Sequence, residues 1–371
     1  MGKIVHLIVG ILVAVCLAMP CVVFGAGFIE PMDRPAVRAK NPAGAVLIDV
    51  TLAGSRIVAV GERGIITYSD DSGNTWKQAN VPTSVTLTAV CFPNPDNGWA
   101  VGHAGIVLNS TDAGETWTLK LDGVVAAEMI YDSAKSEADK KGPEDNAAQT
   151  QLYNAQLFVD DGPDKPFLDI HFKNEREGFI IGAYGLIFRT QDAGNTWQPW
   201  LDRTENEGML NLYAIHASGD MCYIAGEQGL FLISTDGGSL FKRVDTPYIG
   251  TFFDIITASS GEILLVGLLG NAYWSTDQGA TFNKAQVSGE VSFSSAICLD
   301  DGTMVFSNQG GVILKSNDNG RTITTVPDAP RLAPISSIIR INKDTLMTVG
   351  YGGAIPVKLS AEDMQGKGVQ R

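Results

Sequence analysis

The sequence predicts an all-β fold, because one eight-residue motif returns six times and a second motif repeats at a period near 41 residues. The first motif, here called the Asp octet, reads Ser or Thr, any residue, Asp, any residue, Gly, any residue, usually Thr, and usually an aromatic residue. Asp and Ser side chains bond to backbone amides along a turn, Gly adopts a positive φ, and Thr and aromatic residues favour strands. Each octet therefore predicts a tight turn between two strands, in which the aspartate is structural. These aspartates are Asp71, Asp112, Asp192, Asp236, Asp277 and Asp318.

The second motif, Gly-x-x-Gly followed by a short apolar run, precedes every octet and fixes the period. Its seven copies begin at Gly61, Gly102, Gly182, Gly226, Gly267, Asn308 (a degenerate copy) and Gly350. Their spacings are 41, 80, 44, 41, 41 and 42 residues. In the second repeat, strands are expected at 87–92, 98–102, 106–110 and 116–119. Because four short strands in about 40 residues are typical of a propeller blade, we predict a seven-bladed β-propeller over residues 45–360.

The last repeat has no octet, and its chain turns polar over residues 361–371, which we predict to be a tail. Its blade therefore lacks an outer strand, and an open edge in the ring would be a liability. Within the N-terminal segment 26–44, residues 28–40 are the one candidate for that strand. We expect them to close the ring.

The N-terminus has the features of a secretory signal peptide, which we place at residues 1–25. Lys3 precedes an apolar run from Leu7 to Met19, which is too short to span a bilayer. The alternative is an uncleaved N-terminal anchor, since apolar residues resume at Val22. We expect a periplasmic or otherwise exported protein that does not insert in the membrane once the signal is removed.

Residues 122–165 interrupt the repeats after the second blade. Apolar residues recur there at helical spacing in two runs, and ten acidic residues outnumber four basic ones, so we expect an acidic helical hairpin. In a four-stranded blade, the links between blades and the Gly-x-x-Gly turns emerge on one face of the ring, here called the Gly-turn face. The octets emerge on the other face, here called the octet face.

The Gly-turn face varies from repeat to repeat, as a recognition surface would. Leu268 and Leu269 are unusual there, because exposed turns favour polar residues. An apolar patch of this kind binds other proteins. Phe252 and Phe253 either belong to this binding surface or lie in the core of the sheet, and we expect Phe253 to lie in the core. The candidate partner-binding residues are Arg63, His103, Tyr184, Tyr248, Ile249, Phe252, Leu268, Leu269 and Tyr351.

No catalytic motif is evident, and we expect neither an enzyme, nor a metal site, nor a cofactor. His103, His171 and His216 are isolated in the sequence, without metal-ligand spacing, and the last two are expected in the core. Sialidases carry the same octets, so a glycoside hydrolase is one alternative, but the Arg-Ile-Pro segment typical of sialidases is missing. Small-ligand binding in the central channel is another. The net charge of −14 argues against nucleic acid and anionic membranes as partners.

The repeats resemble those of the Ycf48/Hcf136 group of photosystem II assembly factors over about residues 45–359. The likeness rests on residues 60–66 and 69–76, and the segments 167–170, 182–185 and 247–253 are similar to its branch in non-photosynthetic bacteria. The resemblance implies an exported, non-catalytic interaction or assembly factor, with a membrane transporter complex as the implied partner because this branch is often encoded beside RND-type transporters. This chain departs from the photosynthetic members, whose surface is rich in arginine, because it is acidic.

Overall fold

Residues 29–258 and 260–359 are described by the structure, a computed structural model. The chain divides into a short N-terminal unit, Met1–Glu30, and the unit Pro31–Arg371, which holds all the strands and helices described below. The predicted signal peptide and the predicted tail at 361–371 lie outside the described residues. Among the helices that are described, none has both the length and the apolar character of a membrane span.

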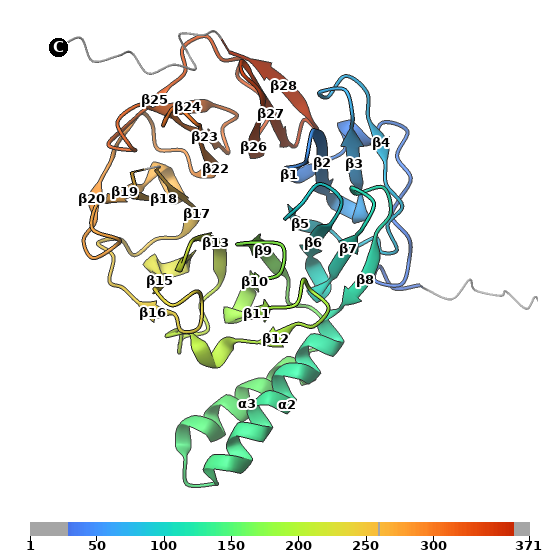
Figure 1. Ribbon diagram of the computed structural model, residues 1–371, viewed down its shortest axis with the longest axis vertical. Coiled ribbons are helices and arrows are strands. Elements are labelled where there is room, and N and C mark those ends of the chain that lie inside the picture. The colour runs from blue at the N-terminus through green and yellow to red at the C-terminus, as the bar shows by residue number, and fades with distance from the viewer. Residues whose placement is uncertain (1–28, 259, 360–371) are drawn as a thin grey trace, which may run out of the picture. The chain divides into compact units, whose positions relative to one another are not determined.

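The described strands of the larger unit form seven sheets that follow one another around a ring (Figure 1). The innermost strands are β1 (Leu47–Ala53), β5 (Leu87–Cys91), β9 (Phe167–Phe172), β13 (Leu212–Ser218), β17 (Phe252–Thr257), β22 (Phe293–Cys298) and β26 (Ile335–Asn342). The second strands are β2 (Arg56–Gly61), β6 (Gly98–Gly102), β10 (Gly178–Gly182), β14 (Met221–Gly226), β18 (Ile263–Gly267), β23 (Met304–Asn308) and β27 (Thr345–Gly350).

The third strands are β3 (Ile66–Ser69), β7 (Val107–Ser110), β11 (Ile187–Thr190), β15 (Phe231–Ser234), β19 (Ala272–Ser275), β24 (Ile313–Ser316) and β28 (Ile355–Lys358). The outer strands are β4 (Lys77–Gln78), β8 (Thr118–Leu121), β12 (Gln198–Pro199), β16 (Lys242–Arg243), β20 (Asn283–Lys284) and β25 (Thr322–Thr325). These strands pair antiparallel, and β21 (Gln286–Val287) adds a parallel partner to β25. The two sequence motifs determine where these strands begin and end, because the same turn residues recur at the same positions of each repeat.

The core lies between neighbouring sheets, and the second strands are its most buried part. Apart from the first residues of β2, β14 and β27, every residue of these strands is buried, because both faces of each strand pack against an adjoining sheet. At several contacts a large side chain lies directly on the octet glycine of the next sheet. A Cβ added to Gly194 would be 2.1 Å from the Trp99 ring, and one added to Gly320 would be 2.7 Å from Leu264. Glycine is required there by close approach as well as by its positive φ.

The last sheet joins the first by the same kind of packing. Met347, in β27, lies against Gly73, where an added Cβ would be 2.5 Å from the Met347 methyl carbon. The Ser337 hydroxyl donates to an Asp49 carboxylate oxygen at 2.8 Å, and the Ala354 amide donates to the Ala43 carbonyl oxygen at 2.8 Å. Side-chain packing and these two bonds connect the ends of the ring.

The expected closing strand is not found at residues 29–40, and Phe28 lies outside the described residues. Within the described part of the chain, the sheet of β26 to β28 has three strands. The segment that was expected to complete it runs along the first sheet instead. The Ala36 amide donates to the Val81 carbonyl oxygen, and the Val37 amide donates to the Arg63 carbonyl oxygen. The Gln78 side chain accepts from the Ala39 amide. These bonds occupy the segment's backbone and hold it away from β28.

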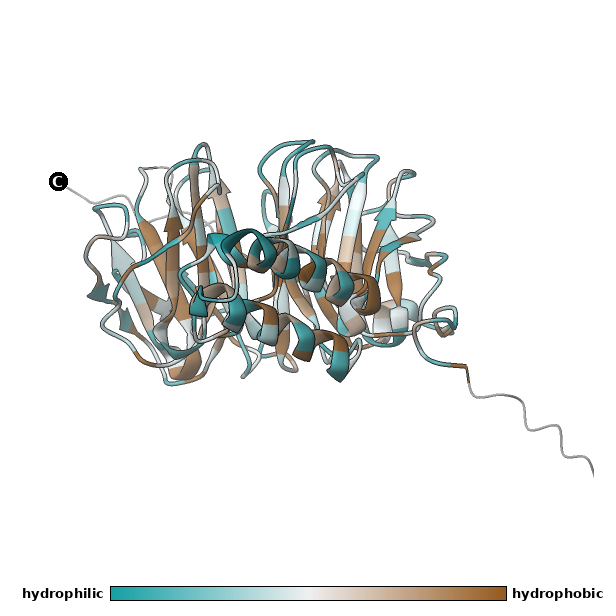
Figure 2. Ribbon diagram, turned by 90° about the horizontal axis from the view of Figure 1, so that it is seen from below, coloured by the Kyte–Doolittle hydropathy of each residue, from teal (hydrophilic) through white to brown (hydrophobic). Residues whose placement is uncertain are grey.

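The insertion forms two antiparallel helices, α2 (Gly123–Lys141) and α3 (Asn146–Asp161), as expected. They extend outward from the rim of the ring (Figure 1), and hydrophilic and hydrophobic residues are interleaved along them (Figure 2). The Asp122 carboxylate caps α2 by accepting from the Val124 and Val125 amides, both at 2.9 Å. At the same base of the hairpin, where α3 ends, Lys165 makes ion pairs with Asp161 at 2.8 Å and Asp164 at 2.6 Å.

Candidate functional site

The connections between strands place the two sets of turns at opposite ends of the ring. Each octet joins a third strand to an outer strand, whereas each Gly-x-x-Gly turn joins a second strand to a third. The insertion links β8, an outer strand, to β9, an inner one, and therefore leaves from the Gly-turn face. Gly123 lies directly against the Gly-x-x-Gly turn of the second sheet, where a Cβ added to Gly105 would be 2.5 Å from the Gly123 Cα atom.

On the octet face the aspartates bond within their own turns. The Asp277 carboxylate accepts from the Thr281 amide at 2.8 Å, from the Thr281 hydroxyl at 2.6 Å and from the Ser275 hydroxyl at 2.8 Å. Asp71 has the same three bonds, and they lower the pKa of both carboxyl groups to about 2, with the Thr hydroxyl bond as the largest cause. Carboxylates bonded in this way stabilise the turn.

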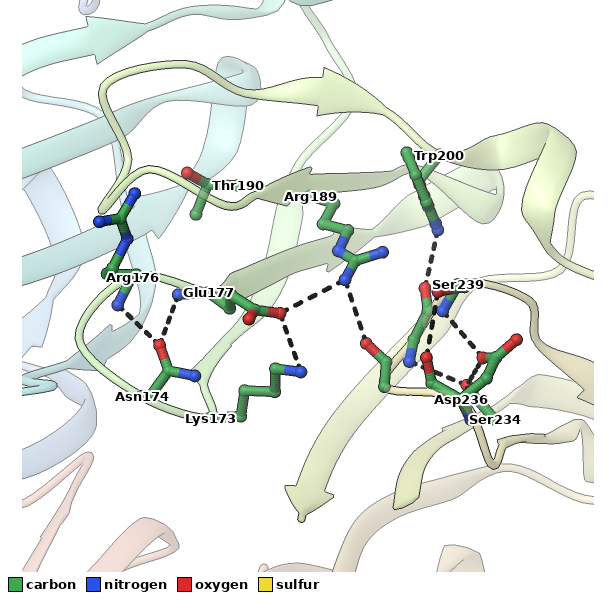
Figure 3. A network of polar contacts seen from close by, with 12 residues as sticks. Lys173, Asn174, Arg176, Glu177, Arg189, Thr190, Trp200, Ser234, Asp236 and Ser239 are labelled. Carbon is green, nitrogen blue, oxygen red and sulfur yellow. Dashed lines mark hydrogen bonds and ion pairs between the residues drawn. The ribbon is translucent and has the colours of Figure 1, made fainter. Parts of the chain in front are cut away.

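The octet face also carries a buried arginine that joins two sheets (Figure 3). The Arg189 guanidinium lies 3.3 Å from a Glu177 carboxylate oxygen and donates to the Gly237 carbonyl oxygen in the octet of the next sheet. The Cζ atom of Arg189 lies 5.1 Å from the centre of the Trp200 ring. Lys173 pairs with Glu177 at 2.8 Å, and chiefly this bond lowers the pKa of the Glu177 carboxyl. Because this arginine is buried and paired, it holds sheets together.

On the Gly-turn face, three aliphatic side chains form a patch at the corner between the fourth and fifth sheets, here called the corner patch: Ile249, Leu268 and Leu269. Their exposed fractions are 90%, 37% and 61%. Tyr248 supports the patch, because its hydroxyl donates to the Leu268 carbonyl oxygen at 3.1 Å. Its ring also packs on Phe252, with ring centres 5.2 Å apart. The structure thus brings together four of the residues that the sequence singled out.

The expectations for the two phenylalanines are reversed. Phe252 is fully buried, so it is a core residue rather than a binding candidate. Phe253 is partly exposed and contacts Tyr213, with ring centres 5.4 Å apart. The physical reason is an irregularity in the pairing of β17 with β18 between Phe252 and Asp254, which changes the direction of the side chains that follow.

The remaining candidates lie on other sheets of the same face. Arg63, His103 and Tyr184 are exposed in the Gly-x-x-Gly turns of the first three sheets, and Tyr351 is exposed in that of the last. Tyr184 lies over Lys165, whose nitrogen is 5.4 Å from its ring centre. Within the described residues, no hydrogen bond or ring contact joins these four side chains to the corner patch.

Two features escaped the sequence. His171 and His216 are not isolated, because their rings lie 5.5 Å apart on neighbouring inner strands. Burial, helped by the charge of His216, lowers the pKa of His171 to about 4, and both histidines are hydrogen-bonded, as core histidines are. The second feature is the lining of a hollow of about 510 Å³ at the centre of the Gly-turn face, since the sequence suggested a central channel but singled out only Tyr351 of the lining residues as a candidate. No group of three or more His, Cys, Asp or Glu side chains arranged like metal ligands occurs in the described part of the chain.

Comparison with known proteins places this geometry in a family. A family model described as photosynthesis system II assembly factor YCF48 matches residues 68–133 and 148–305. The photosystem II assembly lipoprotein Ycf48 of Synechococcus sp. (strain CC9902) is 24% identical over 186 residues, which cover 50% of this chain and 53% of that protein. The match therefore spans about half the length of that curated relative.

Solved structures show the same fold. A YCF48 bound to a D1 peptide has a TM-score of 0.61 and 16% identity, covering 88% of this chain and 99% of its own. YCF48 from Cyanidioschyzon merolae has a TM-score of 0.59 and 16% identity, covering 88% and 98%. The WD40 β-propeller domain of Doa1 has a TM-score of 0.56 and 9% identity, covering 90% and 99%. At these identities the likeness shows the fold alone, which is a β-propeller.

Proposed function

This chain belongs to the family of YCF48 assembly factors, and we propose that it is an exported, non-catalytic assembly or stability factor whose Gly-turn face binds another protein. Its seven sheets are the blades of one propeller, its octets are Asp-box turns with a scaffold role, and residues 1–25 are its signal peptide. The partner is a membrane protein complex, and a transporter complex is the specific candidate, because the resemblance to the non-photosynthetic branch implies it.

The observation that carries this proposal is the corner patch. Leu269 has a φ of +55°, the conformation that Arg63 and Gln228 also have at this position of their turns. At this position the fifth sheet presents a leucine to solvent where those turns present polar residues. A second leucine precedes it, and Ile249, 90% exposed, follows Tyr248, whose hydroxyl bonds to the Leu268 carbonyl oxygen. Exposed apolar side chains gathered at one corner of a sheet are typical of protein-binding surfaces.

The solved relatives support a protein partner. One YCF48 was solved with a D1 peptide bound, so this fold accommodates a peptide ligand in that protein. Here the acidic insertion and the net charge of −14 favour a partner segment that carries positive charge. Arg63 and His103, on the opposite part of the same face, are candidates for contacts at the edge of such an interface.

The corner patch is tested by the double substitution Leu268→Asp and Leu269→Asp. Charged side chains there should abolish capture of the partner from detergent-solubilised membranes after cross-linking, while the melting temperature stays within about 2 °C because both residues are exposed. The matched control is Leu240→Asp, since Leu240 is 40% exposed but belongs to an octet on the opposite face. Capture that survives the double substitution, or that is lost equally in the control, contradicts the proposal.

Small-ligand binding is the second candidate function, and the central hollow favours it over glycoside hydrolysis. Several of the chain's arginines are held in ion pairs on the octet face, as Arg56, Arg189 and Arg321 are, rather than gathered for a sugar carboxylate. A rise in melting temperature with a ligand of fewer than 20 heavy atoms would support this second function. Hydrolysis of fluorogenic glycosides would instead support an enzyme.

A further inference from the structure

The central hollow is built by the first residues of four consecutive inner strands. Tyr213, Phe253 and Ser294 are the second residues of β13, β17 and β22, and Ser336 is the second residue of β26. All four strands begin at the Gly-turn face, so the hollow opens on the same face as the corner patch. The remaining lining residues are Phe293, Gln309, Pro334, Ile335 and Tyr351.

Four of the lining residues are aromatic, and apart from the buried Phe293 their rings are the main feature of its wall. Tyr213 and Phe253 meet edge to face at an interplanar angle of 84°, and Tyr351 is 68% exposed in the turn of the last sheet. The corresponding inner-strand positions of the first three sheets carry Ile48, Thr88 and Leu168, so the aromatic residues are confined to one side of the ring. Ring faces of this kind attract cations through the quadrupole of the π system.

The lining of the hollow carries no charge that opposes a cation. None of the lining residues is Lys, Arg or His. Arg331, on the link that leads to Pro334, donates from Nε to the Gly310 carbonyl oxygen at 3.3 Å. Asp254 directly follows Phe253 but does not line the hollow, and its two carboxylate oxygens accept the Ile255 and Ala296 amides. The case for a cation therefore rests on the rings and on the absence of a basic residue from the lining.

We infer that the central hollow receives a lysine or arginine side chain from an extended segment of the partner protein. The aliphatic part of that side chain packs against the rings of Tyr213, Phe253 and Tyr351, and its charge lies over their faces. The hydroxyls of Ser294 and Ser336 and the amide oxygen of Gln309 supply acceptors for its N–H groups. This inference rests on the proposed function, since it specifies the chemistry of the partner segment.

The test uses the full chain and five synthetic peptides of eleven residues, with Gly and Ser throughout and one central residue: arginine, lysine, citrulline, norleucine or phenylalanine. We expect the arginine and lysine peptides to bind, measured by calorimetry at low salt. Citrulline has the shape of arginine without its charge, and its peptide should bind at least about 5-fold more weakly, as should that of norleucine. Equal or tighter binding of the citrulline, norleucine or phenylalanine peptide overturns the inference, and so does absence of binding by all five.

Substitutions in the wall locate the binding. Tyr351→Leu should lower the affinity for the arginine peptide about 5- to 30-fold. Tyr351→Phe keeps the ring, so its affinity should stay within about 2-fold of that of the wild type. The control is Tyr153→Leu, because Tyr153 is a 65%-exposed tyrosine of α3 outside the hollow. An equal loss in Tyr153→Leu and Tyr351→Leu contradicts the assignment to this hollow. If the double substitution in the corner patch abolishes partner capture but the arginine peptide does not bind, the inference fails and the proposed function stands. If the arginine peptide binds but partner capture survives the double substitution, the hollow binds a cationic side chain and the proposed function fails.

Discussion

At the scale of single residues, the aspartates of this propeller fall into two groups with opposite electrostatics. Those in the octets accept bonds from hydroxyls and amides in solvent, which lowers the pKa of Asp71 and Asp277 to about 2. Those on the inner strands lie in the narrow centre of the ring, where loss of hydration is the largest effect and raises the pKa of Asp169 and Asp254 to about 7. The Asp254 carboxylate still accepts the Ala296 amide of the next sheet, at 2.7 Å, so it is also a link between sheets.

The raised pKa of Asp254 predicts a stability that depends on pH. Between its usual pKa of 3.8 and about 7, the folded protein holds a proton on this carboxyl that the unfolded chain has released. Stability therefore falls as pH rises through this window, by up to about 1.4 kcal/mol per pH unit for each such group. Asp254→Asn removes one group, so the free energy of unfolding of the variant minus that of the wild type should increase from pH 5 to pH 7 in urea titrations.

The control for this measurement is Asp71→Asn. The pKa of Asp71 is lowered to about 2 in the fold, so its contribution is complete above pH 4 and is lost only as pH falls toward 2. The free energy of unfolding of Asp71→Asn minus that of the wild type should be constant from pH 5 to pH 7. Taking differences also cancels the titration of His171, whose lowered pKa acts in the opposite direction. A flat difference for Asp254→Asn would show that this carboxyl is ionised in the fold at pH 5.

At the scale of elements, the sequence predicts the turns well, because their requirements are local. Each octet closes with bonds between residues two to four apart, such as the Ser275 hydroxyl, which accepts from the Gly279 amide. The helical hairpin is local in the same way, since Asp122 and Asp145 cap its helices from the preceding residue. Side-chain direction on β17 was not predictable, because it follows from how β17 pairs with β18 around Asp254. The exposure of the turn residues Leu268 and Leu269 was therefore predictable, whereas the direction of the side chains on the inner strands was not.

The octet glycines predict a large cost for one added methyl group. Gly194→Ala combines a positive φ of 75° with a clash against the Trp99 ring, so we expect a loss of about 2–4 kcal/mol in the free energy of unfolding. Gly219→Ala is the matched control, because Gly219 has a φ of 62° and no atom within 4 Å of an added Cβ. Its loss should be about 1 kcal/mol. Equal losses in urea denaturation would mean that backbone conformation, and not contact between sheets, selects glycine in the octets.

At the scale of the whole molecule, the first and last sheets meet by side-chain packing and two hydrogen bonds, and residues 29–258 and 260–359 form no strand that the two sheets share. The sequence could not show this, because the hydrogen-bond partners of residues 31–40 lie on the first sheet, far from them in the sequence. The expectation of a closing strand came from the absence of an octet in the last repeat, which is a correct observation about β28 and its missing neighbour. The period of the repeats could be read from the sequence, since the Gly-x-x-Gly motif recurs in every repeat, with a degenerate copy at Asn308.

If the junction between the last and first sheets is equivalent to the others, its core side chains contribute equally to stability. Met347 packs on Gly73 across this junction, as Leu264 packs on Gly320 between the fifth and sixth sheets, and both side chains are fully buried. Met347→Ala and Leu264→Ala should therefore each lower the free energy of unfolding by about 2–5 kcal/mol, measured by urea denaturation at neutral pH. A loss below about 0.5 kcal/mol for Met347→Ala beside a full loss for Leu264→Ala would mean that the ring opens between β27 and β2 in solution. Equal losses would mean that packing is as firm at this junction as at the others, so the Gly-turn face needs no fourth strand in the last sheet.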